Sequence, residues 1–185
     1  GGCLGSSAIH IENRLKGACK NYQKLPIEEK ESYRWISTAI ASKAVLCEAD
    51  CVTFIGDREN DIYEFIDRIP DEKTHIITRA RHNRQLEDGD KLFEQLEKEA
   101  LSGEVKITVS REMRNNRPER EAVLGIKFSE VVIKKSKKCV NKAASKTIRL
   151  WVVEAKEIDC PEGQEAVHWV LLTTHKVKDV EAAKQ

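Results

Sequence analysis

The stretch CVTFIGDRENDIYEF, residues 51–65, decides how this chain folds. It opens with a short β-prone run, Val52–Ile55, which Gly56 interrupts. Asp57 and a polar turn come next, and apolar residues then recur at helical spacing, namely Ile62, Phe65, Ile66 and Ile69. We expect a buried strand that ends at Asp57 and a helix that begins near Asp61. Because chemistry in α/β sheets collects at the carboxyl ends of strands, Asp57 is a candidate metal ligand, although capping of the helix by Asp57 or Asp61 explains the same pattern.

The composition is that of a folded globular chain. Of its 185 residues, 34% are charged and 40% are hydrophobic, which excludes a disordered chain. No apolar run approaches the ~20 residues that a membrane span needs, so we expect no membrane partner. The six cysteines are scattered without a CxxC pair, which favours reduced thiols in a cytoplasmic protein over a zinc site.

Two elements flank the opening stretch. Pro26 predicts the start of a helix that buries Trp35 and Ile36, and Thr74–Arg79 predicts the next strand. The second strand leads into four basic or imidazole side chains, Arg79, Arg81, His82 and Arg84. If the two strands are parallel, these side chains lie beside Asp57 at one rim of the sheet. A carboxylate beside arginines suits phosphodiester chemistry, since the cations hold phosphates and the carboxylate holds a metal; a solvated basic loop is the simpler alternative.

The hydrophobic pattern changes after residue 90. Lys91–Ala100 predicts a short amphipathic helix, and apolar residues alternate with polar ones beyond it. The alternating segments are 105–109, 122–128, 131–133, 148–152 and 167–171. They predict a mostly antiparallel sheet over residues 103–174. The lysine-rich loop at residues 136–146 favours a solvated turn, with contact to a DNA backbone as the second interpretation.

Five stretches resemble one family. GDRENDIYEF, residues 56–65, is similar to the second-aspartate motif of bacterial insertion-sequence DDE transposases of the DRE-x-DIY group. Four more stretches resemble parts of that family in the same order, at residues 25–40, 74–86, 115–126 and 165–174. The similarity covers residues 25–178, and five motifs in one order are more specific than one.

The resemblance implies a fold and a reaction. The fold class is α/β of the α+β type: a partial ribonuclease H-like mixed sheet with helices over residues 1–90, a mostly antiparallel β insertion over 91–178, and a frayed tail over 179–185. In the family, three carboxylates hold two Mg²⁺ ions that cut double-stranded DNA at transposon ends and join it elsewhere, usually in a homodimer on paired ends. The chain matches the central part of such an enzyme, in which Asp57 is the matching carboxylate.

The resemblance also assigns DNA contacts. Arg79, Arg81 and His82 match basic positions near the family's active site, and we add Arg84 from the same cluster. Arg114 and Arg117 match a turn that touches transposon-end DNA. Trp169 matches the tryptophan on which a flipped base stacks, with core packing beside Val167 and Leu171 as the alternative. A non-catalytic DNA-binding remnant and a protein-interaction domain remain alternative functions.

The first prediction concerns metal and cleavage. The isolated chain should bind Mg²⁺ weakly and should not cut DNA, because one family carboxylate does not supply the oxygen ligands that this ion requires. Incubating labelled transposon-end DNA with the chain and Mg²⁺ checks this, and metal-dependent cleavage would contradict it.

Overall fold

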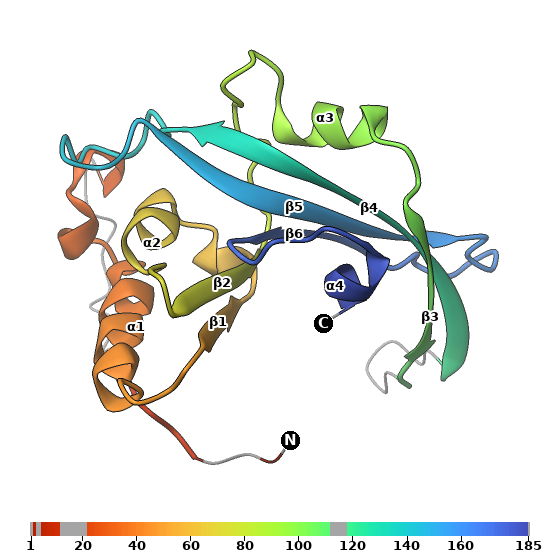
Figure 1. The fold of residues 1–185 in the computed structure, drawn as a ribbon, viewed down its shortest axis with the longest axis horizontal. Helices are drawn as coiled ribbons and strands as arrows, with labels where there is room; N and C mark the ends of the chain where they lie inside the picture. The colour runs from red at the N-terminus through yellow and green to blue at the C-terminus, as the bar shows by residue number, and fades with distance from the viewer. Residues whose placement is uncertain (1, 3–4, 12–21, 112–117, 185) are drawn as a thin grey trace.

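A mixed sheet forms the centre of the computed structural model, which describes residues 2, 5–11, 22–111 and 118–184. The predicted contacts Arg114 and Arg117 lie outside the described residues. Six strands are described, in the order β1-β2-β6-β5-β4-β3 (Figure 1). Their bounds are β1 (Val52–Gly56), β2 (Thr74–Arg79), β3 (Gly103–Val109), β4 (Arg120–Lys134), β5 (Thr147–Ile158) and β6 (His168–Thr173). The expected α+β class is confirmed.

Short helices connect and cover these strands. The α-helices are α1 (Tyr33–Val45), α2 (Tyr63–Arg68), α3 (Leu92–Lys98) and α4 (Val180–Lys184). Single 3-10 turns lie at η1 (Tyr22–Lys24), η2 (Ile27–Glu29) and η3 (Arg58–Asn60). The helix predicted from Pro26 begins later than expected, because Lys30 takes an extended backbone conformation (φ −97°, ψ 145°) and separates η2 from α1.

The expected parallel pair is present. β1 and β2 run parallel, in register from Val52 opposite Thr74 to Gly56 opposite Thr78. The prediction that β1 is a buried strand is wrong in one respect. β1 lies at an edge of the sheet with one face covered, so Phe54 packs against the core while the Ile55 side chain is 77% exposed.

β6 makes the sheet continuous across the expected boundary at residues 90 and 91. It pairs antiparallel with β2, with Arg79 opposite Leu171, and antiparallel with β5 on its other side. The antiparallel strands predicted for residues 103–174 are confirmed. They extend the same sheet as β1 and β2 and do not form one of their own.

Two apolar clusters lie on opposite faces of the sheet. The larger one packs α1 and α2 against one face, with Ile36, Phe65 and Ile76 at its centre. The smaller one lies on the other face, where Ala182 and Ala183 of α4 pack against it (Figure 1). The tail over residues 179–185, which was predicted to fray, contains α4 in its described part, and Ala182 and Ala183 pack against the smaller cluster.

A pair of stacked histidines ties the chain before α4 to the sheet. The ring centroids of His75, on β2, and His175 are 4.0 Å apart. His175 Nε2 lies 2.9 Å from the Thr53 hydroxyl oxygen on β1, and His75 Nδ1 lies 3.3 Å from that of Thr174. Burial lowers the pKa of His175, and the nearby His75 lowers it further.

The histidine pair predicts a loss of stability in mild acid. Because the pKa of His175 is lower in the folded chain than in the unfolded one, the unfolded chain binds more protons as the pH falls below about 6.5. The free energy of unfolding should therefore fall until the pH passes below the folded-state pKa. Urea unfolding between about pH 7.5 and 5.5 measures this fall. His175→Gln should reduce it, whereas His10→Gln, at an exposed position, serves as the control. Equal pH dependence in His175→Gln and the wild type would contradict the prediction.

Candidate functional site

The carboxyl ends of β1 and β2 form a rim that carries the predicted aspartate. Asp57 follows β1, and its Oδ1 accepts a hydrogen bond of 2.8 Å from the Glu59 backbone N–H, which caps η3. The Thr78 hydroxyl donates to the Asp57 carbonyl oxygen at 3.2 Å and ties the two strand ends together. Asp57 therefore caps η3 and not the predicted helix, α2, whose N-cap residue is Ile62, and the Asp57 carboxylate is exposed.

Gly56 explains how the chain turns so tightly beside the rim. A Cβ atom at this position would lie 2.2 Å from the side-chain Nδ2 of Asn60 and 2.5 Å from the Asn60 Cβ. The buried Asn60 side chain occupies the space that any other residue at position 56 would need. Glycine at the strand end thus lets η3 fold back closely against β1.

Asp61 organises the loop that follows β2. Its Oδ2 accepts hydrogen bonds from the backbone N–H groups of Arg81, at 2.8 Å, and His82, at 2.9 Å. Its Oδ1 accepts from Arg84 Nε at 3.0 Å and also from Arg84 Nη2. The helix-capping alternative is wrong for Asp61, because Ile62 is the N-cap residue of α2.

Arg84 does not belong to the exposed basic cluster. Its residue is 7% exposed, and its guanidinium forms a buried ion pair with the Asp61 carboxylate. The DNA contact predicted for Arg84 stays a prediction, which this pairing does not support. A buried charge is stable only when it is paired, and Nε and Nη2 of Arg84 already donate to Asp61.

Arg79 stands at the end of β2 beside a second arginine. Its Nη2 donates to the His168 carbonyl oxygen at 3.1 Å, which links it to the start of β6. Burial lowers the pKa of Arg79, and the nearby Arg58 guanidinium lowers it further. Arg79 nevertheless stays charged at neutral pH. Arg58 is thus a site residue that sequence reasoning missed, since an arginine in a polar turn has no distinguishing pattern.

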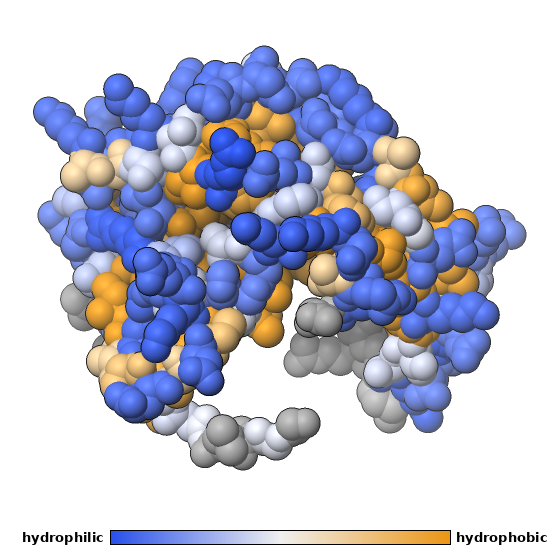
Figure 2. Space-filling model, viewed as in Figure 1, coloured by the Kyte–Doolittle hydropathy of each residue, from blue (hydrophilic) through white to orange (hydrophobic). Residues whose placement is uncertain are grey.

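Strand register places three predicted residues on one face at the rim. Ile55 lies opposite Ile77, and Arg79 lies opposite Leu171. Because side chains alternate along a strand, Asp57, Arg79 and Trp169 occupy positions on this same face. This is also the face that carries α4, and it is hollowed between β1 and β3 (Figure 2).

Trp169 is exposed on this face. It lies opposite Ala155 of β5, and 41% of its surface is accessible. Val167 and Leu171 pack against the smaller apolar cluster, while Trp169 belongs to neither cluster. The core-packing alternative for Trp169 is therefore not supported, and an aromatic ring is accessible near the Arg79 end of β6.

The described residues do not by themselves fit a two-metal centre. They contain no group of three or more His, Cys, Asp or Glu side chains that could hold a metal ion. Glu59, next to Asp57, pairs with Arg34 at 2.9 Å, and Asp61 is committed to Arg84. The rim thus offers Asp57 as a single carboxylate, whereas Mg²⁺ prefers several oxygen ligands in octahedral geometry.

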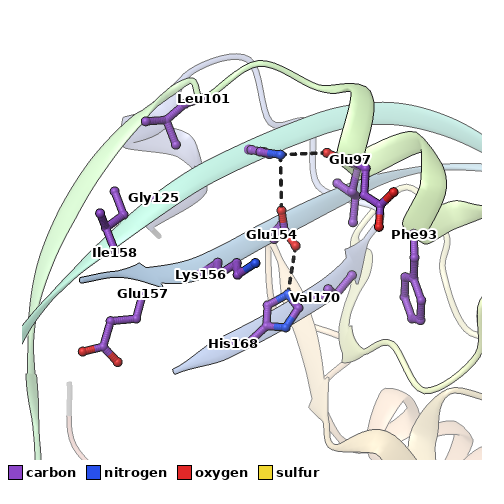
Figure 3. Close-up of a pocket in the computed structure, with 12 residues that line it drawn as sticks. Phe93, Glu97, Leu101, Gly125, Glu154, Lys156, Glu157, Ile158, His168 and Val170 are labelled. Carbon is purple, nitrogen blue, oxygen red and sulfur yellow. Dashed lines mark hydrogen bonds and ion pairs between the residues drawn. The ribbon is translucent and has the colours of Figure 1, made fainter. Parts of the chain in front are cut away.

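A hollow of about 580 Å³ lies between α3 and the sheet (Figure 3). Phe93, Leu96 and Val170 supply apolar walls. Its central carboxylate, Glu154, accepts from His168 Nε2 at 2.8 Å and lies 3.8 Å from Lys127 Nζ (Figure 3). These three polar groups pair with one another, and none of the predicted site residues lines this hollow.

Comparison with known families adds no assignment. No model of a known protein family matches the chain. The resemblance to DDE transposases therefore rests on the quoted sequence stretches alone. Among the described residues, no helix is both long enough and apolar enough to cross a membrane.

The buried ion pair predicts a contrast between two aspartates. Asp61→Asn should lower the free energy of unfolding by about 3–5 kcal/mol, because it leaves the Arg84 charge buried without a counterion. Asp57→Asn should change it by less than about 0.5 kcal/mol, since Asn caps a helix as well as Asp and the position is exposed. Urea unfolding of both variants measures the contrast, and equal effects would contradict it.

Proposed function

We propose that this chain is the central part of a DNA transposase that cuts and joins double-stranded DNA by metal-dependent phosphodiester chemistry. One observation carries the proposal: the register of β1, β2 and β6 brings Asp57, Arg79 and Trp169 to the same face at one rim. These residues come from stretches of the chain that are far apart, and each matches the transposase resemblance independently.

The arginines at the rim supply phosphate binding. Arg58 and Arg79 lie close enough for each charge to act on the other, and neither has a carboxylate partner in an ion pair among the described residues. An anion placed between them relieves this repulsion. A DNA phosphate is such an anion, and neutralising it releases condensed counterions, which favours binding at low salt.

Trp169 supplies a stacking surface. A base that leaves the duplex loses its stacking partners, and an exposed aromatic ring compensates for part of that loss. The hydrogen bond from Arg79 to the His168 carbonyl links the residue before Trp169 to the phosphate-binding end of β2. A flipped base and its phosphate can therefore be held by neighbouring parts of one rim.

Asp57 supplies one carboxylate to the chemistry. In the proposed enzyme Asp57 would be one of the residues that hold a Mg²⁺ ion, and that ion would supply Lewis-acid activation for the phosphodiester chemistry. The other carboxylates would come from outside this rim, so we expect the isolated chain to be inactive. The whole enzyme would act as a homodimer on paired transposon ends, in the bacterial cytoplasm at the nucleoid.

A protein-interaction domain is the second candidate function. Ile55 is 77% exposed on β1, which is an edge strand in the described sheet, and such edges pair readily with other chains. Binding through this edge would depend little on salt, whereas binding to DNA phosphates weakens steeply as salt increases.

DNA titration tests the proposal. Fluorescence anisotropy with a labelled hairpin and a blunt duplex, each at two salt concentrations, should show binding that weakens at the higher salt. Arg79→Gln should weaken binding to both DNAs about tenfold and reduce the salt slope by about 0.9, because one phosphate contact is lost. Trp169→Ala should cost a further ~1–3 kcal/mol on the hairpin alone, where a base is free to stack.

Arg149→Gln is the matched control. Arg149 is an exposed arginine on β5 that pairs with Glu130, on a different part of the sheet. It should leave DNA affinity unchanged. An absence of salt-dependent binding, or an equal loss in Arg149→Gln and Arg79→Gln, would overturn the proposed function.

A further inference from the structure

A second hollow of about 360 Å³ lies beside the start of α2. Three segments that are distant in the sequence surround it: the turn before α1, the loop after β2 and the loop after β4. The groups that bear on its chemistry are Arg81, His82, Lys138 and the hydroxyls of Ser32 and Ser136. Arg81 and His82 are two of the residues that the resemblance assigned to DNA contact, whereas Lys138 and the two serines have no earlier assignment.

Arg81 and Lys138 bring unpaired positive charge to this hollow. Their side chains have no hydrogen-bond or ion-pair partner among the described residues. Both are exposed on the wall of the hollow. The side chains can therefore turn toward a ligand without breaking an existing interaction.

The carboxylates at the hollow do not neutralise these charges. Asp61 is saturated by Arg84 and by two backbone N–H groups, so its charge is already compensated. Glu64, which is 5% exposed, is the second carboxylate. Four cationic side chains line the hollow against these two carboxylates, namely Lys30, Arg81, Arg84 and Lys138, so an excess of two positive charges remains.

His82 reports this electrostatic environment. Partial burial lowers the pKa of His82 most, and the neighbouring cations Arg84, Lys138 and Arg81 lower it further against the opposing effect of Asp61. An anion in the hollow would counter the cations and favour the protonated imidazole. A bound anion thus turns a neutral ring into an additional charged donor.

We propose that this hollow is a phosphate-binding site, in which Arg81 and Lys138 hold the anion and His82 adds a third donor. Hydrogen bonds between cationic donors and phosphate oxygens are about twice as strong as those between neutral groups. Asp61 holds the backbone of Arg81 and His82, so the path of the loop is set before the ligand arrives. The hydroxyls of Ser32 and Ser136 also line the hollow and suit the remaining oxygens.

The phosphate can come from two sources. One is a phosphodiester of DNA bound at the rim, and this source rests on the proposed function. The other is a free phosphate monoester such as a nucleotide. The proposed site does not depend on which source is correct, because the charges and hydrogen-bond donors that define it belong to this chain.

Titration with inorganic phosphate tests the site directly. NMR of the histidine side chains, with His82 assigned through His82→Gln, should show a saturable shift and a raised His82 pKa in the intact chain. Arg81→Gln and Lys138→Gln should each weaken phosphate binding about tenfold, because each removes one charge-assisted contact. Lys156→Gln is the matched control, an exposed lysine at the hollow under α3. The absence of a saturable His82 shift, or a shift that survives both substitutions unchanged, would overturn the proposal.

DNA titration of the same variants distinguishes the sources. If Lys138→Gln weakens DNA binding and reduces the salt slope by about 0.9, the site holds a DNA phosphate. If phosphate binding is lost and DNA affinity is unchanged, the site serves a free phosphate monoester. Both results support the proposal that the hollow binds phosphate. Failure of the Arg79→Gln test would remove the transposase proposal and leave the inorganic phosphate titration as a separate test.

Discussion

The buried ion pair between Asp61 and Arg84 is the interaction on which the rim depends. Two opposite charges in a dry interior are stable only if every remaining donor and acceptor is satisfied. Arg84 also donates to the Asp61 carbonyl, and the carboxylate accepts the backbone N–H groups of Arg81 and His82. This arrangement holds the chain after β2 against the start of α2. It thereby sets the direction in which Arg81 and His82 leave the sheet.

The position of β6 brings together residues that are far apart in the sequence. Because β6 lies between β2 and β5, residues that are about ninety positions apart become neighbours, as Arg79 and His168 do. One face of the rim then carries Asp57, Arg79 and Trp169, while the loop beyond β2 lines a hollow beside α2. The proposed DNA contacts and the proposed phosphate site thus occupy two parts of the same edge of the sheet.

Sequence reasoning identified part of this candidate site. Asp57 and Arg79 could be placed at one rim, because each follows a recognisable strand and parallel strands end at the same edge. The burial of Arg84 could not be predicted, since a run of basic residues does not reveal which of them pairs with a buried carboxylate. Arg58 and Lys138 were not distinguished from other surface charges, because their neighbours come from other segments of the chain.

The sequence by itself determined the local elements of this protein. The bounds of β2 match the predicted Thr74–Arg79, and the alternating residues beyond position 103 became antiparallel strands, because periodicity and backbone propensity act over a few neighbouring residues. Tertiary structure alone decided that β6 inserts beside β2, that Ile55 stays exposed at an edge, and that α4 packs on the sheet. Those outcomes depend on contacts between distant segments, whose free energies are determined by the burial and pairing that the whole fold allows.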